Sequence, residues 1–130
     1  MKNYILVLSL LLGSVSYAQS AVEVSLKSIM KDMSTKLKTI AAQSTDATKN
    51  ISSEAIANEL VKSVSAAKEV IPSSADDKAR QDLYIKTIDG VITLSKQLAQ
   101  AFHDNDNVKA ADILSQLSQA KKDGHAEFKK

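Results

Sequence analysis

The sequence contains no cysteine. The chain therefore has no disulfide, no thiolate metal site and no CxxCH motif for covalent attachment of a cofactor. With 130 residues it forms at most one modest domain. Such a domain must be held together by its apolar core or by a bound group.

Proline and glycine are also scarce. Pro72 is the only proline, and the glycines are Gly13, Gly90 and Gly124. Long segments that lack proline and are rich in Ala, Leu, Lys, Gln and Glu favour helix. No segment shows the strict alternation of apolar and polar residues that is typical of a half-buried strand. The sequence therefore predicts an all-α protein.

The N-terminal segment has a pattern of its own. Lys2 supplies a positive charge, residues 4–12 (YILVLSLLL) form a short apolar run, and Ser16 and Ala18 occupy the two positions that a signal peptidase reads. A membrane-spanning helix needs roughly 20 apolar residues, so an uncleaved anchor is the less favoured alternative. We predict a secretory signal peptide over residues 1–18 and a periplasmic domain over residues 19–130 that no membrane holds.

Neither sign of charge dominates. The formal net charge is +2, and it falls to +1 (2 − 1) once the only charge of the signal segment, Lys2, is removed. This balance argues against nucleic acid as a partner, because nucleic-acid binding usually requires a strongly basic face. No nucleophile–base pair and no carboxylate cluster is recognisable, so we predict neither an enzyme nor a small-molecule substrate.

Four segments show the helical period. Three of them are predicted over residues 21–42, 51–71 and 75–103. The fourth follows a tight polar turn at residues 104–107 and runs to about residue 128, and residues 43–50 read as a loop. Pro72 cannot continue a helix, so the second helix is expected to run to Ile71. Ser74 and Asp77 resemble a capping box for the third helix, and Asp106 is a candidate N-cap of the fourth.

Gly90 lies inside the third predicted helix. Glycine there costs about 1 kcal/mol relative to alanine. The expected reason is the close approach of a neighbouring helix.

The apolar residues of these segments recur at steps of three and four, as on the buried face of a helix. Four helices joined by short connections predict an antiparallel up-down-up-down four-helix bundle. In that topology the start of the first helix and the end of the fourth lie at the same end of the bundle. Met30 and His125 should therefore lie close together, with Pro72 and Tyr84 nearby.

The last helix carries a histidine on its apolar stripe. This stripe consists of Leu114, Leu117, Lys121, His125 and Phe128, and it is expected to point into the core. A buried imidazole needs a partner. Taken alone, His125 is a partly exposed residue of the last turn or a ligand of a metal or cofactor. The other histidine, His103, reads as a surface residue favoured by the dipole at a helix C-terminus.

Met30 taken alone fills a gap in the core. Together with His125 it offers one thioether and one imidazole, which can ligate a haem iron from opposite sides. An apolar slot could be lined by Met33, Leu37, Ile40, Tyr84, Ile88 and Leu117. Lys121 could lie along the ring and reach its mouth. Two alternatives remain open: a helical module without haem, and a site for copper or another metal formed by Met30, Met33 and His125.

At these residues the chain resembles the soluble cytochrome b562 family, a well-known example of this bundle topology. The segment LKSIMKDMSTKLKTI resembles the family's haem-methionine segment, with Met30 at the ligand position. The segment LSQAKKDGHAEFKK resembles its haem-histidine segment, with His125 at the ligand position. Pro72 resembles the family's proline turn beside the haem.

Two further positions match the family pattern, and two others depart from it. Tyr84 matches an aromatic pocket position, and Lys121 matches a basic residue beside the haem. The chain departs from the family pattern at Ile88 and at Gly124, where the family tends to have aromatic residues.

The resemblance implies a periplasmic b-type cytochrome that holds one noncovalent haem b and carries one electron. Met30 and His125 would then bind the iron, and other redox proteins would be the partners. Lys27, Lys31, Lys121 and Lys122 could favour partners with acidic surfaces, unless they form an ordinary solvated face.

Overall fold

The structure, a computed structural model, describes residues 25–128. The predicted signal peptide (1–18) and the first residues of the predicted domain (19–24) lie outside the described residues. Residues 25–43 are helical and belong to the first helix. They are followed by the 3₁₀ helix η1 (Ala47–Lys49) and the helices α2 (Asn50–Lys68), α3 (Lys78–His103) and α4 (Asn107–Phe128). No helix within residues 25–128 is both long and apolar enough to cross a membrane.

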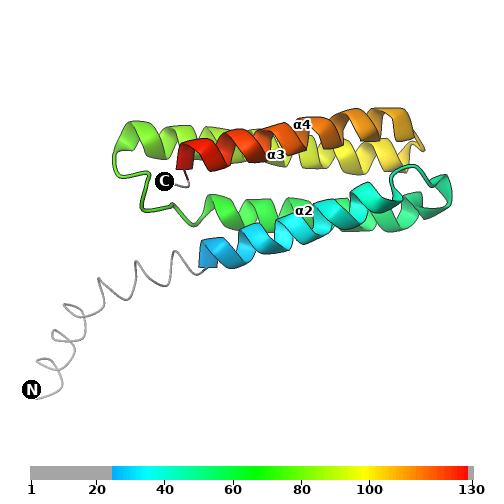
Figure 1. Ribbon diagram of the computed structural model, residues 1–130, viewed down its shortest axis with the longest axis horizontal. Coiled ribbons are helices and arrows are strands. Elements are labelled where there is room, and N and C mark those ends of the chain that lie inside the picture. The colour runs from blue at the N-terminus through cyan, green and yellow to red at the C-terminus, as the bar shows by residue number, and fades with distance from the viewer. Residues whose placement is uncertain (1–24, 129–130) are drawn as a thin grey trace, which may run out of the picture.

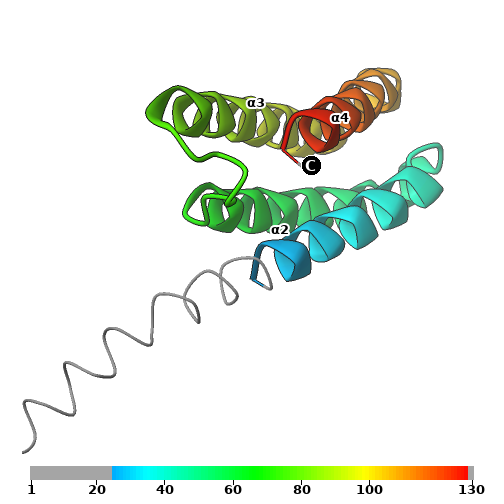
Figure 2. The same cartoon turned by 60° about the vertical axis from the view of Figure 1, so that its left-hand side comes forward.

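The helices form two layers. The first helix lies beside α2, and α3 lies beside α4 (Figures 1 and 2). Consecutive helices run in opposite directions, which confirms the predicted all-α, antiparallel up-down-up-down four-helix bundle. The described start of the first helix and the end of α4 lie at one end of the bundle, together with the connection between α2 and α3, which contains Pro72 (Figure 1). We call this the proline end, and the opposite end, with Asn50 and Asn107, the asparagine end.

The core runs along the facing seams of α2 and α3. In α2 the residues Ala57, Leu60, Val64 and Ala67, which recur at steps of three and four, are fully buried. The seam of α3 is buried at Tyr84, Ile88, Leu98 and Phe102, with Ser95 between them donating to the Val91 carbonyl at 2.8 Å. These two helices therefore form the centre against which the outer helices pack.

The first helix is buried unevenly. Ile40, near the asparagine end, is fully buried. The seam residues nearer the proline end pack against the core but stay half-buried; they are Leu26, Met30, Met33 and Leu37. Apolar surface is therefore partly exposed at the proline end of this helix.

Helix α2 ends earlier than predicted. Its last residue is Lys68, and the N–H of Glu69 donates to the carbonyls of Ala66 and Ala67. The N–H of Val70 also reaches back to the Ala67 carbonyl, at 3.2 Å. The helix thus tightens into a final turn before Pro72 is reached, so the predicted end at Ile71 is wrong.

The predicted capping box is wrong in one of its two residues. Asp77 caps α3 by accepting from the N–H of Arg80 at 2.8 Å, and α3 begins at Lys78 rather than at residue 75. The Ser74 hydroxyl instead donates to the Phe128 carbonyl of α4 at 2.6 Å. At the start of α4, Asp106 accepts from the Lys109 N–H at 3.0 Å, which confirms it as the N-cap.

Two smaller predictions are corrected. The segment predicted as a loop after the first helix contains η1, whose N-cap Asp46 accepts from the Thr48 N–H at 3.0 Å. Gly90 is exposed, and a Cβ atom added there would meet no neighbour within 4 Å. No helix approaches Gly90 closely, and the structure supplies no other reason for glycine at this position.

Asparagine side chains join the two layers at the asparagine end. Asn50, only 3 % exposed, and Asn107 exchange two amide hydrogen bonds of 2.9 Å. Asn50 also donates to Asn105 at 2.9 Å, and Asn107 donates to the Ser44 carbonyl at 2.6 Å. Buried polar groups need such partners, so this network fixes the first and third connections of the bundle to each other.

We expect Asn50→Ala to lower the free energy of unfolding by about 1–3 kcal/mol, because it leaves the amide of Asn107 without its buried partner. Urea denaturation measures this change. Asn58→Ala is the matched control: Asn58 is exposed on the same helix, and its replacement should leave stability unchanged or slightly raised. Equal effects of the two substitutions would contradict the role given to the network.

Candidate functional site

A contact between the first helix and α4 shows how these two helices are aligned. The Lys121 ammonium of α4 donates to the Ser34 hydroxyl of the first helix at 3.0 Å. Met30 precedes Ser34 by one helical turn, and His125 follows Lys121 by one turn. Because the helices are antiparallel, both steps lead about 6 Å toward the proline end. Met30 and His125 therefore lie at the same level of the bundle.

The two flanks of α4 face different neighbours. Leu117, 2 % exposed, marks the inward face of α4. At about 100° per residue, Lys121 and His125 lie on one flank of that face and Glu127 on the other. Lys121 contacts the first helix, whereas Glu127 accepts a hydrogen bond from Arg80 of α3. His125 thus lies on the flank toward the first helix.

The apolar stripe predicted for α4 does not stay in the core. Leu117 is buried and Phe128 half-buried, but Lys121 and His125 are exposed. The prediction that the whole stripe points inward is wrong for these two residues. Each step of four residues rotates a stripe by about 40°, so positions 121 and 125 move from the core toward the first helix.

Tyr84 and Phe128 form an aromatic pair at the proline end. Tyr84 is 2 % exposed, and its hydroxyl donates to the Ala67 carbonyl of α2 at 2.6 Å. The rings meet edge to face with centroids 5.3 Å apart. Burial raises the pKa of Tyr84 to about 12, so the phenol stays a protonated donor. Tyr84 thereby ties together the ends of α2, α3 and α4.

The other predicted apolar residues lie in or against the same core. Ile88 is buried, while Met30, Met33 and Leu37 pack against the core from its edge. The predicted site residues thus form a graded set: Tyr84 and Ile88 inside, the first-helix residues at the edge, and Lys121 and His125 at the rim.

Gly124 directly precedes His125 and lies beside α3. It lines a shallow groove of about 230 Å³ with residues that include Leu83, Thr87 and Phe128. A Cβ atom added at Gly124 would meet no neighbour within 4 Å. Packing therefore does not require glycine here, and the last turn of α4 lacks the stiffness that a side chain would give it.

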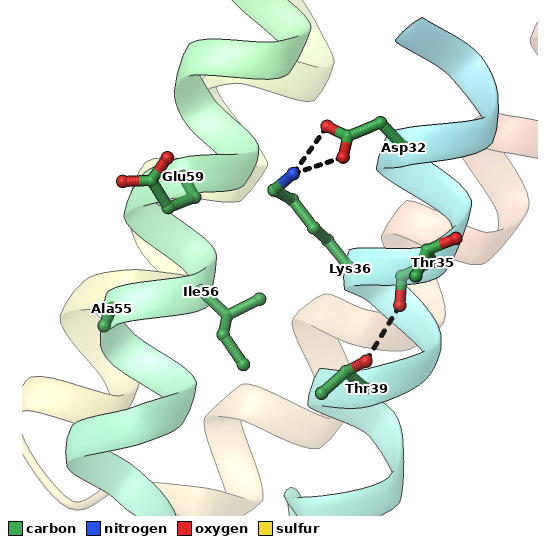
Figure 3. A pocket seen from close by; sticks show the side chains of 7 residues that line it. All are labelled: Asp32, Thr35, Lys36, Thr39, Ala55, Ile56 and Glu59. Carbon is green, nitrogen blue, oxygen red and sulfur yellow. Dashed lines mark hydrogen bonds and ion pairs between the residues drawn. The ribbon is translucent and has the colours of Figure 1, made fainter. Parts of the chain in front are cut away.

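A second groove, of about 340 Å³, lies between the first helix and α2 (Figure 3). Its carboxylate Asp32 accepts hydrogen bonds of 2.5 Å from Lys36 and from Ser63. Both hydrogen bonds lower the pKa of Asp32 below its usual value, and the bond from Lys36 has the larger effect. Such a carboxylate is a poor general base near neutral pH. The groove contains none of the predicted site residues.

The thioether of Met30 and the imidazole of His125 are the side-chain groups at the proline end that could donate an electron pair to a metal. Within residues 25–128, no three side chains of His, Cys, Asp or Glu gather in a way that could hold a metal ion. The other histidine, His103, is exposed at the end of α3, with its Nδ1 3.0 Å from the Glu54 carboxylate. His103 therefore lies at the asparagine end, away from Met30.

A model of the cytochrome b562 family matches residues 25–129, which is more than half of the 130-residue chain. The chain belongs to the cytochrome b562 family. Comparisons with curated proteins and with solved structures give no match. Membership confirms the resemblance drawn from the segments around Met30 and His125, while the roles of individual residues stay predictions.

The residues of this cytochrome b562 family member fit the haem that the family implies. A thioether and an imidazole lie at one level on neighbouring helices. Half-buried apolar side chains adjoin them, and Lys121 brings a cation to the rim. These are the donors, the apolar surface and the positive charge that an iron porphyrin with carboxylate groups requires.

Sequence reasoning missed one part of this region. Arg80 donates to Ser74 and to Glu127, and its guanidinium lies 5.6 Å from the centre of the Phe128 ring. The available signal was that Arg80 is the only arginine in a chain that otherwise uses lysine. A planar guanidinium donates from three separate nitrogens in fixed directions, whereas the donors of a lysine all radiate from one nitrogen.

We expect Tyr84→Phe to lower the free energy of unfolding by about 1 kcal/mol at neutral pH, because it removes the buried hydrogen bond from the hydroxyl to the Ala67 carbonyl and leaves that carbonyl only the N–H groups of Glu69 and Val70. The raised pKa of Tyr84 also makes the free energy of unfolding depend on pH in the alkaline range. The folded protein holds the phenolic proton more tightly than the unfolded chain, whose pKa is near 10.0. This contribution is complete below that pH and is lost as the pH rises toward about 12.

Tyr84 is the only tyrosine outside the predicted signal peptide. Phenolate absorbance of the protein without that segment therefore reports its pKa directly, and unfolding curves of both proteins at rising pH report the linked stability. The two proteins differ only at position 84, so the comparison isolates Tyr84. A phenolate midpoint at the ordinary value of 10.0 would contradict the burial argument.

Proposed function

We propose that the protein is a periplasmic electron carrier that holds one noncovalent haem b between the first helix and α4, with Met30 and His125 as the iron ligands. The observation that carries this proposal is the Lys121–Ser34 contact, because it reports a register of the two helices in which both donors lie at one level. Family membership supports the haem and the electron-carrying role.

Each ligand has a distinct task. A haem iron supplies one-electron chemistry when bound. With a haem bound, the Met30 thioether would favour the reduced iron and so raise the reduction potential, and a ring nitrogen of His125 would be the stronger donor. Met30 is half-buried against the core, and His125 lies on the rim of α4. The two donors thus come from a shielded and an accessible side of the site.

The remaining site residues provide surroundings for the ring. The apolar lining comes from Met33, Leu37, Tyr84 and Ile88. The Lys121 ammonium contacts the neutral Ser34 hydroxyl, and none of the ion pairs among the described residues involves it. Its charge therefore remains available for the carboxylate groups of a haem.

We propose redox proteins as the partners. With Met30 and His125 both holding the iron, a bound haem would supply chemistry for carrying an electron rather than for binding a substrate, so the proposed role is electron transfer. Lys27, Lys31 and Lys122 are exposed, and in residues 25–128 none of them takes part in an ion pair. Their uncompensated charges favour partners with acidic surfaces.

The proposed location follows from the N-terminal segment. Residues 1–18 have the charge, apolar run and cleavage positions of a secretory signal peptide. Cleavage after Ala18 would release residues 19–130 into the periplasm. The family's periplasmic location agrees with this proposal.

Haemin titration of residues 19–130 tests the site. We expect stoichiometric binding and a sharp low-spin spectrum after reduction with dithionite. Met30→Ala and His125→Ala should each abolish that spectrum, because each removes one axial ligand. His103→Ala is the matched control, since His103 is an exposed histidine at the asparagine end, and it should change neither binding nor spectrum.

The outcomes separate the alternatives. Failure to bind haemin, or spectra that neither ligand substitution changes, would sink the haem proposal. Binding of Cu(I) in place of haemin, lost in both Met33→Ala and His125→Ala, would favour the metal site with two methionines. A low-spin spectrum retained in Met30→Ala and lost in the double substitution with Met33→Ala would identify Met33 as the ligand.

A further inference from the structure

The last turn of α4 is held by side chains from outside the helix. Arg80 of α3 donates from Nη2 to the Glu127 carbonyl at 2.8 Å and from Nη1 to the Glu127 carboxylate at 2.9 Å. The Ser74 hydroxyl donates to the Phe128 carbonyl at 2.6 Å. Carbonyls at a helix C-terminus have no partner within the helix. Here Ser74 and Arg80 supply the missing donors.

Further contacts fix the guanidinium itself. Arg80 Nε donates to the Ser74 carbonyl at 2.9 Å, and the guanidinium lies 5.6 Å from the centre of the Phe128 ring. Phe128 in turn packs edge to face on the buried Tyr84. We call the set of Ser74, Arg80, Glu127 and Phe128 the Arg80 clamp. It joins the connection after α2, the start of α3 and the end of α4.

His125 lies between Gly124, which has a low helix propensity, and the clamp. Gly124 precedes it without steric restraint, and the clamp holds the two residues that end the helix. Arg80 binds Glu127 on the flank of α4 that faces α3. His125 lies on the opposite flank, toward the first helix. Contacts on one flank of a helix fix its rotation about its own axis. The clamp therefore determines the direction in which position 125 projects.

We propose that Arg80 is a positioning residue for His125: through Glu127 and Phe128 it holds the last turn of α4 so that the imidazole faces the first helix. This inference rests on the proposed function, because it gives Arg80 its role through an iron ligand. A lysine could replace it only in part. The donors of an ammonium radiate from one nitrogen, whereas the guanidinium donates from three nitrogens to two carbonyls and a carboxylate while it lies over the Phe128 ring.

The test compares Arg80→Ala and Arg80→Lys with Lys78→Ala. Lys78 is the control because it lies in the same first turn of α3 and forms an exposed ion pair with Asp82, at 3.0 Å, away from α4. Haemin-loaded proteins are examined well below their unfolding temperatures. We expect Arg80→Ala to lose haem about 10-fold to 100-fold faster, the usual cost of removing a group that orients a metal ligand. It should also show a high-spin fraction.

Hydrogen exchange of the haem-free proteins supplies a second measurement. Amides of residues 125–128 should exchange at least about 10-fold faster in Arg80→Ala, because the charge-assisted hydrogen bonds that hold the turn are gone. Arg80→Lys should fall between the unaltered protein and Arg80→Ala in both measurements, and Lys78→Ala should match the unaltered protein. If Arg80→Ala fails to fold, Arg80→Lys and Ser74→Ala, which removes only the bond to Phe128, carry the comparison.

The results distinguish this inference from the proposed function. A chain that does not bind haemin, or binds it without His125, overturns the proposed function and with it the role of Arg80. Normal binding that depends on His125, together with unchanged haem loss, spectrum and exchange in Arg80→Ala, overturns the inference alone. Faster exchange without any change in haem loss or spectrum also overturns it, because the clamp would then be merely structural.

Discussion

Burial of the apolar seams of α2 and α3 is the constraint on which the rest of the structure depends. Leu60, Val64, Leu98 and Phe102 are at most 1 % exposed, and they form the centre on which the first helix and α4 pack. An exposed hydrogen bond such as Lys121–Ser34 contributes little free energy by itself. It reports the register of the outer helices, which the central packing and the short connections determine.

The two ends of the bundle differ in what they leave exposed. At the asparagine end, reciprocal amide bonds join the connections and Ile40 is fully buried. At the proline end, the apolar residues of the first helix stay half-buried, and the last turn of α4 depends on donors from its neighbours. The two ends are therefore held by different interactions, and the partly exposed apolar surface of the first helix lies at the proline end.

The last turn of α4 combines weak and strong restraints. Gly124 lowers helix stability directly before His125, and the Arg80 clamp restrains the residues directly after it. Tyr84 links this region to α2 through its hydrogen bond to Ala67. The environment of position 125 therefore depends on contacts from three elements that are remote in sequence.

The sequence alone predicted the helical class, the bundle topology and the family, because seam periodicity and ligand-segment patterns are local properties. It also identified Asp106 as a helix cap. The wrong predictions concern relations between elements: Ser74 caps α4 instead of α3, Gly90 meets no neighbour, and Lys121 and His125 turn out of the core. The Arg80 clamp was invisible for the same reason. Side-chain partners across helices depend on register and rotation, which only tertiary packing decides.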